Sequence, residues 1–257
     1  MPAPVLIVVP TLGRRLDFLE QTLNSICVQE PTADIVVVTP ASAKDARALA
    51  ASSGAVVADD PGSLPAAINL GVSLASADHE FVNWIGDDDL LAPGSLSTTV
   101  GIMRADPGIV LAYGACQYID PLGRALWTNR AGWWAQRVLA WGPDLIPQPG
   151  MLVRLDAWRA VGGVHESLRF AFDLDLLLKL KRVGRFEDVG SVVSSFRWHP
   201  DSLTVSDRTA SLEESEAVKR RYLTPTARRM AWLWEHPVRV ATRTAANEVS
   251  RRAHAMQ

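Results

Sequence analysis

The sequence predicts an α/β fold: an open, mainly parallel sheet flanked by helices, followed by a helical C-terminal extension. Short apolar runs rich in β-branched residues alternate with amphipathic segments through the first half of the chain, which is typical of such a sheet. With 257 residues, 48% of them hydrophobic, the chain is long enough to bury a sizeable core. Residues 217–257 carry nine basic side chains against two acidic ones, so this last part differs in character from the rest.

The first half of the chain alternates strands with helices over short connections. We expect strands at 5–9, 34–40, 55–60 and 79–86, and helices at 17–29, 43–54 and 63–76. In open parallel sheets, ligands bind outside the carboxyl ends of the strands. The residues that directly follow each strand are therefore the first candidates for a site.

The second half has a weaker pattern. We expect a helix at 93–107, a strand or hairpin arm at 108–120, a strand and then a helix at 150–163, a helix at 173–184 and a strand at 186–199. Between them, residues 126–150 hold four tryptophans among Gly and Pro and are predicted to form a long, partly ordered segment: Trp127, Trp133, Trp134 and Trp141. These indoles are expected to pack a small lobe over the sheet, to form a mobile lid or a platform for a bound ligand, or to do both.

Composition argues against several classes of protein. The formal net charge is -2, so no general attraction to nucleic acid is expected. The two cysteines, Cys27 and Cys116, lie far apart and support neither a zinc site nor a disulfide framework. The apolar run near the N-terminus is short and follows no basic residue, which indicates a buried strand instead of a signal peptide. No stretch reaches the roughly 20 apolar residues of a membrane span, and we expect a cytoplasmic protein.

Three consecutive aspartates, Asp87, Asp88 and Asp89, follow the strand predicted at 79–86. Each ionised carboxylate makes ionisation of its neighbour less favourable, and a divalent cation would remove that cost. Mg²⁺ and Mn²⁺ take oxygen ligands, and Mg²⁺ commonly binds one or two carboxylates together with substrate phosphates. The alternative is a solvated turn in which one aspartate caps the helix that begins near Pro93.

Two further clusters of polar residues lie in the second half. Asp173 and Asp175 stand at the start of an apolar helix, where helix capping explains one acidic residue but not two. Arg197 and His199 end the last predicted strand. The guanidinium could face phosphate and the imidazole could ligate a metal, although a single histidine is more often an ordinary surface residue.

Together and in this order, these segments resemble family 2 glycosyltransferases, inverting enzymes of the GT-A fold that use nucleotide-diphosphate sugars. The resemblance covers residues 4–206. The matching segments are VVPTLGRRLDFLEQTLNSICVQ, GDDDLLAPGSL, QPGMLVRLDAWRAVGGVHESLRFAFDLDLLLKL and FRWHPDSLT.

The resemblance implies catalytic and metal-binding roles. Asp173 stands where the family has its general base, and Asp175 is the second candidate. Asp87 and Asp89 are the outer carboxylates of a D-x-D motif; in an alternative register that begins at Gly86, Asp88 is the metal ligand. His199 is a candidate for a further metal or diphosphate contact. The expected cofactor is a divalent cation, Mg or Mn, and the candidate donor-contacting residues are Pro10, Thr11, Thr39, Asp59, Asn69, Asp87, Asp88 and Arg197.

Two departures from the family pattern lie where many members contact the nucleotide of the donor. Many members have an acidic residue after the second strand, where this chain has Thr39, and an arginine before the helix asparagine, where it has Ile68. Base recognition is then left to Thr11, Asp59 or Asp60. The donor is open among UDP-, TDP- and GDP-linked sugars.

Three parts of the chain are expected. Residues 1–110 form the donor-binding half of one GT-A domain, 111–206 its acceptor-binding and catalytic half, and 207–257 a basic, Trp-containing helical extension. The extension suits either peripheral contact with the inner face of a membrane or packing on the core or on a second copy in a homo-oligomer.

The resemblance implies an inverting transferase. The cation stabilises the leaving nucleotide, and an aspartate takes the proton of the attacking hydroxyl of a glycan or lipid-linked acceptor. Two alternatives are a catalytically degenerate sugar-nucleotide-binding or assembly module and a sugar-phosphate nucleotidyltransferase. The latter is disfavoured because PTLGRR lacks the Gly-rich loop and the basic signature of such enzymes.

Overall fold

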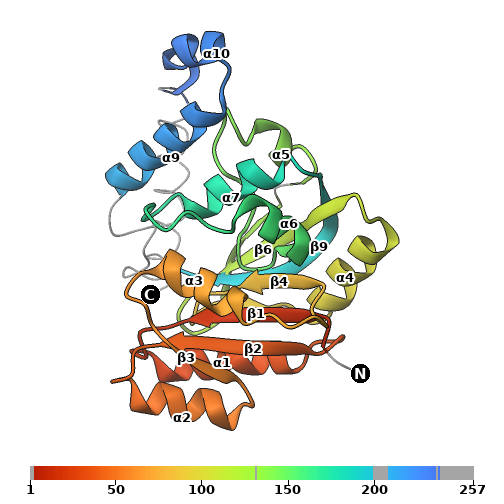
Figure 1. Ribbon diagram of the computed structural model, residues 1–257, viewed down its shortest axis with the longest axis vertical. Coiled ribbons are helices and arrows are strands. Elements are labelled where there is room, and N and C mark those ends of the chain that lie inside the picture. Colours follow the sequence, from red (N-terminus) through yellow and green to blue (C-terminus); the bar gives the residue numbers. More distant parts are fainter. Residues whose placement is uncertain (1–2, 131, 199–207, 236, 238–257) are drawn as a thin grey trace.

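The computed structural model describes residues 3–130, 132–198, 208–235 and 237. Within these residues nine strands form one sheet, in which eight follow the order β3-β2-β1-β4-β8-β6-β9-β5 and β7 pairs with β6. Helices cover both faces of the sheet (Figure 1). The predicted α/β class is confirmed.

The first half is the expected alternation of parallel strands and helices. Its strands are β1 (Val5–Pro10), β2 (Ala33–Thr39), β3 (Val56–Asp59) and β4 (Phe81–Trp84), and its helices are α1 (Leu16–Cys27), α2 (Lys44–Ser52) and α3 (Leu64–Ser73). The β-branched runs are buried on both faces. Val5, Ile7 and Val9 pack with α1 and α2, whereas Leu6 and Val8 pack with α3.

The second half makes the sheet mixed. It contains β5 (Leu90–Leu91), α4 (Ser95–Ala105), β6 (Ile109–Ile119), β7 (Ala125–Asn129), α5 (Ala135–Val138), β8 (Leu152–Arg154), α6 (Leu155–Val161), α7 (Phe172–Leu180) and β9 (Arg185–Arg197). The short strand β8 lies between β4 and β6 and is antiparallel to both. Strand β9 runs parallel to β6 along nearly its whole length, so the last long strand brings its carboxyl end beside the turn between β6 and β7.

Several boundaries differ from the prediction. The segment at 126–150 contains most of strand β7 and the short helix α5, because β7 forms a hairpin with β6. The helix expected to reach residue 184 ends at Leu180. Strand β5 was not predicted, since two residues that owe their pairing to β9 carry no local pattern.

Helices α9 (Arg208–Tyr222) and α10 (Pro225–Met230) lie in the C-terminal part. Helix α9 packs against α7, and Val218 is fully buried. The Tyr222 hydroxyl donates a hydrogen bond of 2.8 Å to Asp175 of α7. The first helix of the predicted extension, α9, thus packs on the core of the domain. No helix in the described part of the chain has the length and apolarity needed to cross a bilayer.

Candidate functional site

A large cleft, with a volume of about 800 Å³, opens at the carboxyl ends of β1 and β4. Residues from both halves line it, and α9 contributes to it as well. Among the lining residues are Thr11, the aspartates at 87–89, Asp144, Asp173 and Ser215. Its position is the one that the parallel-strand topology favours for a ligand.

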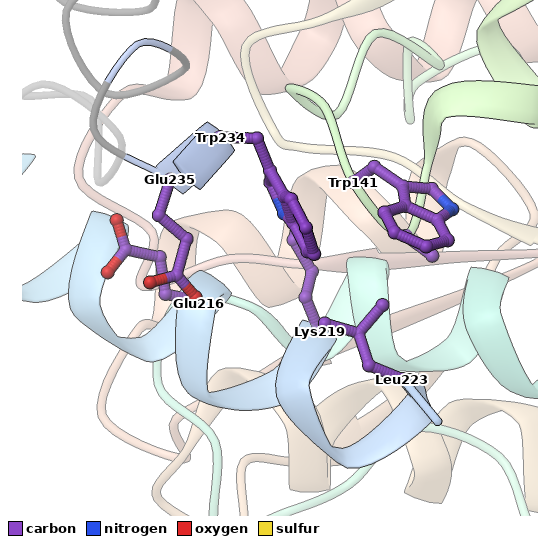
Figure 2. A pocket seen from close by; sticks show the side chains of 7 residues that line it. Trp141, Glu216, Lys219, Leu223, Trp234 and Glu235 are labelled. Carbon is purple, nitrogen blue, oxygen red and sulfur yellow. The ribbon is translucent and has the colours of Figure 1, made fainter. Parts of the chain in front are cut away.

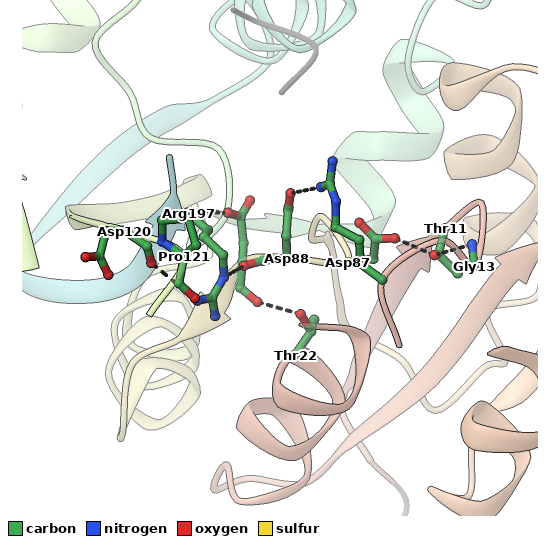
Figure 3. Close-up of polar contacts among 10 residues, drawn as sticks. Thr11, Gly13, Thr22, Asp87, Asp88, Asp120, Pro121 and Arg197 are labelled. Carbon is green, nitrogen blue, oxygen red and sulfur yellow. Dashed lines mark hydrogen bonds and ion pairs between the residues drawn. The ribbon is translucent and has the colours of Figure 1, made fainter. Parts of the chain in front are cut away.

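The aspartate loop follows β4 and forms one wall of the cleft. The Thr11 hydroxyl donates a hydrogen bond to Asp87 and accepts one of 2.9 Å from the amide of Gly13. An Arg15 guanidinium nitrogen lies 3.3 Å from an Asp88 carboxylate oxygen. The first two aspartates are thus tied to the loop that follows β1 (Figure 3).

Asp89 is the most enclosed of the three, with 4% of its surface exposed. Its carboxylate accepts the backbone N–H of Arg197 at 2.9 Å, and its carbonyl accepts the Thr22 hydroxyl at 2.8 Å. Burial raises the pKa of Asp89 well above its ordinary value, and the neighbouring charges of Asp88 and Asp87 raise it further. The repulsion expected between adjacent carboxylates thus adds to the effect of burial at Asp89.

Arg197 supports the loop from within the protein and is only 1% exposed. Its guanidinium donates to the carbonyl oxygens of Asp88 at 2.9 Å and Pro121 at 3.0 Å, and to the Gln21 side chain at 2.9 Å. It also lies over the ring of Phe18, 4.3 Å from the centroid. Arg197 is not among the residues that line the cleft. In this structure its guanidinium holds the aspartate loop, and the phosphate contact expected from the sequence stays a prediction.

Two carboxylate oxygens converge above Gly86. A methyl group on Gly86 would lie 2.9 Å from Oδ1 of Asp88 and 3.1 Å from Oδ2 of Asp89. In the part of the chain that the structure describes, no three His, Cys, Asp or Glu side chains form a complete cation site. Mg²⁺ typically needs only one or two carboxylates besides substrate phosphates. His199, the fourth predicted ligand, lies outside the described residues.

Asp173 lies on another wall of the cleft, in the first turn of α7. Its Oδ1 accepts the backbone N–H of Leu174 at 2.7 Å. Burial raises the pKa of Asp173 to about 6. Asp144 lines the same cleft; burial within the cleft raises its pKa, and the charge of Asp173 raises it further. Two carboxylates that disfavour each other's ionisation thus share this wall.

Asp175 has a different environment, although it is only two residues from Asp173. It is 2% exposed, lies 3.0 Å from the Lys179 ammonium and accepts the hydroxyl of Tyr222. Residues two apart on a helix point in different directions. Asp175 joins α7 to α9 through Tyr222 and is not among the residues lining the cleft, so the geometry favours Asp173 of the two candidate bases.

The predicted donor-contacting residues divide into two groups. Pro10, Thr11 and Asp60 line the cleft, as do Asp87 and Asp88.

Thr39, Asp59 and Asn69 do not line the cleft. Thr39 is fully buried, Asp59 pairs with Arg47 at 2.8 Å, and Asn69 bonds both backbone groups of Val164. Asn69 thus fastens α3 to the loop that precedes α7. Their donor contacts stay predictions, and the geometry gives these three residues structural contacts instead.

Sequence reasoning missed Asp144 and the part played by α9. Asp144 lies in PDLIPQPG, an irregular segment in which prolines hide any periodicity. Gln148 in the same segment donates a hydrogen bond of 2.6 Å to the carbonyl of Trp84, at the end of β4. The only sequence signal for Asp144 was that it is an acidic side chain in a proline-rich stretch.

The tryptophans divide between the cleft and the outer surface. The ring of Trp127 packs against Tyr118, with the centroids 5.2 Å apart, and Tyr118 lines the cleft. Trp141 packs on Trp234 with centroids 4.9 Å apart, beside a second pocket that also involves Lys219 (Figure 2). That pocket holds only about 20 Å³, room for about one water molecule, and is no substrate site.

Comparison with protein families gives a match over more than half of the chain. The family model described as glycosyl transferase family 2 matches residues 6–144. Chondroitin synthase of Pasteurella multocida (strain Pm70) is 23% identical over 148 residues, which are 57% of this chain and 15% of that protein. Hyaluronan synthase of Pasteurella multocida is 23% identical over 146 residues, 56% of this chain and 14% of that protein. The chain thus corresponds to a small part of these relatives.

Solved structures show the same architecture. The mannosyltransferase PcManGT of Pyrobaculum calidifontis, in complex with GDP-Man and Mn²⁺, superposes with a TM-score of 0.66 at 19% identity, over 95% of this chain and 75% of that one. S. aureus TarS 1–349, in complex with UDP, gives a TM-score of 0.60 at 14% identity, over 85% and 69%. The predicted GT-A type of fold is confirmed.

Replacing Arg197 tests its support of the aspartate loop. In Arg197→Met, buried carbonyl oxygens lose their donor, and we expect the free energy of unfolding to fall by about 2–4 kcal/mol. Urea denaturation measures the change. The matched control is Arg159→Met at an exposed position of α6, where a change within about 0.5 kcal/mol is expected. Equal stability of the two variants would contradict the assigned role.

Proposed function

This chain belongs to glycosyltransferase family 2, and on that premise we propose that it transfers a sugar from a nucleotide-diphosphate donor to a hydroxyl of a glycan or lipid-linked acceptor. The observation that carries the proposal is the shared cleft, in which the aspartate loop after β4 forms one wall and Asp173 of α7 another. A cation-binding loop and a separate carboxylate are the two elements that such a transfer needs.

The donor is proposed to lie along the rim formed by Thr11, Arg14 and Asp60, which line the cleft beside the carboxyl ends of β1 and β3. Support comes from the structural neighbours, one of which holds GDP-Man and another UDP. UDP, TDP and GDP are the candidate nucleotides.

A divalent cation, Mg²⁺ or Mn²⁺, is proposed to bind at Asp88 and Asp89. The convergence of their oxygens above Gly86 supports this, as does the Mn²⁺ present with the mannosyltransferase neighbour. Bound there, the cation supplies positive charge to the diphosphate leaving group. Asp87, held by Thr11, completes the oxygen-rich wall.

Asp173 is proposed as the general base. Its carboxylate would accept the proton of the acceptor hydroxyl, whose oxygen forms a bond to the anomeric carbon as the bond to the nucleotide diphosphate breaks. Attack from the face opposite the leaving group inverts the configuration. A pKa raised to about 6 makes Asp173 a stronger base than an ordinary aspartate while leaving it largely ionised at neutral pH.

Nucleotide binding tests the donor and the cation together. We expect UDP, TDP or GDP to raise the thermal midpoint of the full chain with Mn²⁺ and to do so weakly with EDTA, because a ligand at 100 times its Kd stabilises the folded state by roughly 2.7 kcal/mol. The Mn²⁺-dependent part should be lost in Asp88→Asn.

The matched control is Asp45→Asn, at an exposed position on α2, which should respond as the wild type does. No stabilisation by any of the three nucleotides would contradict the donor proposal. Binding without turnover of any sugar nucleotide would support the degenerate module instead.

Replacing the base tests the mechanism. In Asp173→Asn we expect kcat to fall by roughly 10²–10⁴, the usual contribution of general base catalysis, while the affinity for the nucleotide stays near that of the wild type. Asp78→Asn, at an exposed position before β4, is the control and should keep its activity.

The pH dependence of the wild type adds a second readout. Because Asp173 acts only when ionised, we expect the rate to rise with pH through about 6, the raised pKa of this carboxyl. A rate that is flat between pH 5 and 8 would remove Asp173 from the role of base.

Peripheral contact with an anionic membrane is proposed for the C-terminal part. Trp232 is 69% exposed and Leu233 46%, and Arg228 and Arg229 are exposed on the preceding helix. Exposed indoles beside basic side chains suit the interface of an anionic bilayer. The alternative partner is a second copy of the chain.

Vesicle co-sedimentation tests this contact. We expect the full chain to sediment with vesicles containing phosphatidylglycerol, and the double variant Trp232→Ser, Leu233→Ser to sediment several-fold less, since it loses apolar area at the interface. Leu122→Ser, which removes a leucine that is 79% exposed at the β6–β7 turn, is the control. Equal sedimentation of both variants would contradict the contact.

A further inference from the structure

Glu214 makes an unusual contact between α9 and the segment that leads into α7. Its carboxylate accepts three successive backbone N–H groups, those of Arg169 at 3.0 Å, Phe170 at 2.6 Å and Ala171 at 2.7 Å. Asp173 follows only two residues later, in the first turn of α7. A residue more than forty positions away in the sequence therefore fixes the start of the helix that carries the base.

The contact holds the three residues that lead into α7, the last of which is the N-cap residue Ala171. N-terminal N–H groups of a helix lack partners within the helix, and a Ser, Thr, Asp or Asn usually supplies one. Here the N-cap residue is Ala171, which has no side chain for the purpose. The carboxylate of Glu214 accepts the N–H groups that lead into the helix, and its negative charge is favourable at a helix N-terminus.

We propose that Glu214 is the positioning residue for Asp173, holding the entry to α7 so that the Asp173 carboxylate points into the cleft. The inference rests on the proposed function of Asp173 as the base. Glu214 itself does not line the cleft, whereas Ser211 and Ser215 of the same helix do. Together with the bond from Tyr222 to Asp175, α9 is attached to α7 at two points.

The charges around Asp173 make its pKa a measurable sign of the contact with Glu214. Burial is the main cause of the raised pKa of Asp173, and the charge of Glu214 raises it further. Asp144 lines the same cleft, and the charges of Asp173 and Lys219 both act on it. Neutralising Glu214 should therefore lower the pKa of Asp173.

Glu214 stays ionised because of the same contacts. Burial would raise its pKa, but the three N–H groups and the charge of Arg221 hold that pKa below its ordinary value. The negative charge is thus present throughout the pH range in which Asp173 titrates.

The first test follows the carboxyl carbon of Asp173 by ¹³C NMR during a pH titration of the full chain, with the signal assigned from Asp173→Asn. We expect a lower pKa of Asp173 in Glu214→Gln than in the wild type. Glu213→Gln removes the same charge from the adjacent, exposed position of α9 and should leave that pKa unchanged. This measurement needs no turnover, so it judges Glu214 even if the proposed transfer fails.

The second test measures nucleotide release from UDP-glucose and GDP-mannose with Mn²⁺, water serving as the acceptor. A displacement of about 1 Å at a reacting group can cost roughly 100-fold in rate, and we expect Glu214→Ala to lower kcat by about 10- to 100-fold with KM for the donor nearly unchanged. Glu214→Gln retains one carbonyl acceptor and should be intermediate.

Each outcome has one meaning. A wild type that releases no nucleotide from either donor counts against the proposed function and leaves the titration to decide about Glu214. An unchanged pKa of Asp173 in Glu214→Gln overturns the positioning role, and so does an active wild type whose kcat survives in Glu214→Ala. If Glu214→Ala does not fold, Glu214→Gln carries both measurements.

Discussion

The site depends on the hydrogen bonds of the buried Arg197 guanidinium. It connects the end of β9 with the aspartate loop, with α1 through Gln21 and with the turn between β6 and β7 through Pro121. A buried charge is tolerated only where hydrogen bonds and opposite charge compensate its desolvation. These partners provide the hydrogen bonds, and the nearby carboxylates of Asp88, Asp89 and Asp120 provide the opposite charge. The same residue uses its backbone N–H to hold Asp89. One arginine thus fixes the position of the loop and of its most buried carboxylate.

The charge of the cleft constrains what it can bind. Among the described residues that line it, six are acidic and two are arginines: Asp60, Asp87, Asp88, Asp89, Asp144, Asp173, Arg14 and Arg15. A diphosphate would enter against this excess of negative charge. We infer that a donor is accepted as its complex with a divalent cation, which offsets the excess where the carboxylate oxygens converge. The pKa of Asp89 is raised mainly by burial, and the negative charges of Asp88 and Asp87 add to that rise.

The first half of the fold was predictable because its information is local. Each β-branched run and each amphipathic segment up to β4 carries its own period, and right-handed parallel connections leave little freedom in their order. The placement of β8 between β4 and β6, and the pairing of β5 with β9, depend on partners far away in the sequence. No window of residues around these strands contains that information.

The residues of the candidate site also differ in whether local sequence could predict them. The sequence indicated the aspartate loop and the acidic start of α7, since both are compact motifs at element ends. The resemblance ranked Asp173 before Asp175, but the residue pattern alone does not separate them, because the orientation of α7 decides which of them lines the cleft. The structural contacts of Arg197 and Asn69 could not be predicted, because a polar side chain that holds two segments together has the same composition as one that holds a substrate. Asp144 and Glu214 act through segments that meet only in the folded protein.

The bond between Arg197 and Asp88 spans 109 positions of the sequence, and this has a consequence for synthesis of the chain. The βαβ half emerges from the ribosome first and can begin to fold as a unit. Its aspartate loop stays without its support until β9 has also emerged, and closing so large a loop is slow compared with forming local structure. A nascent chain therefore completes this cleft late, when most of the domain has been made.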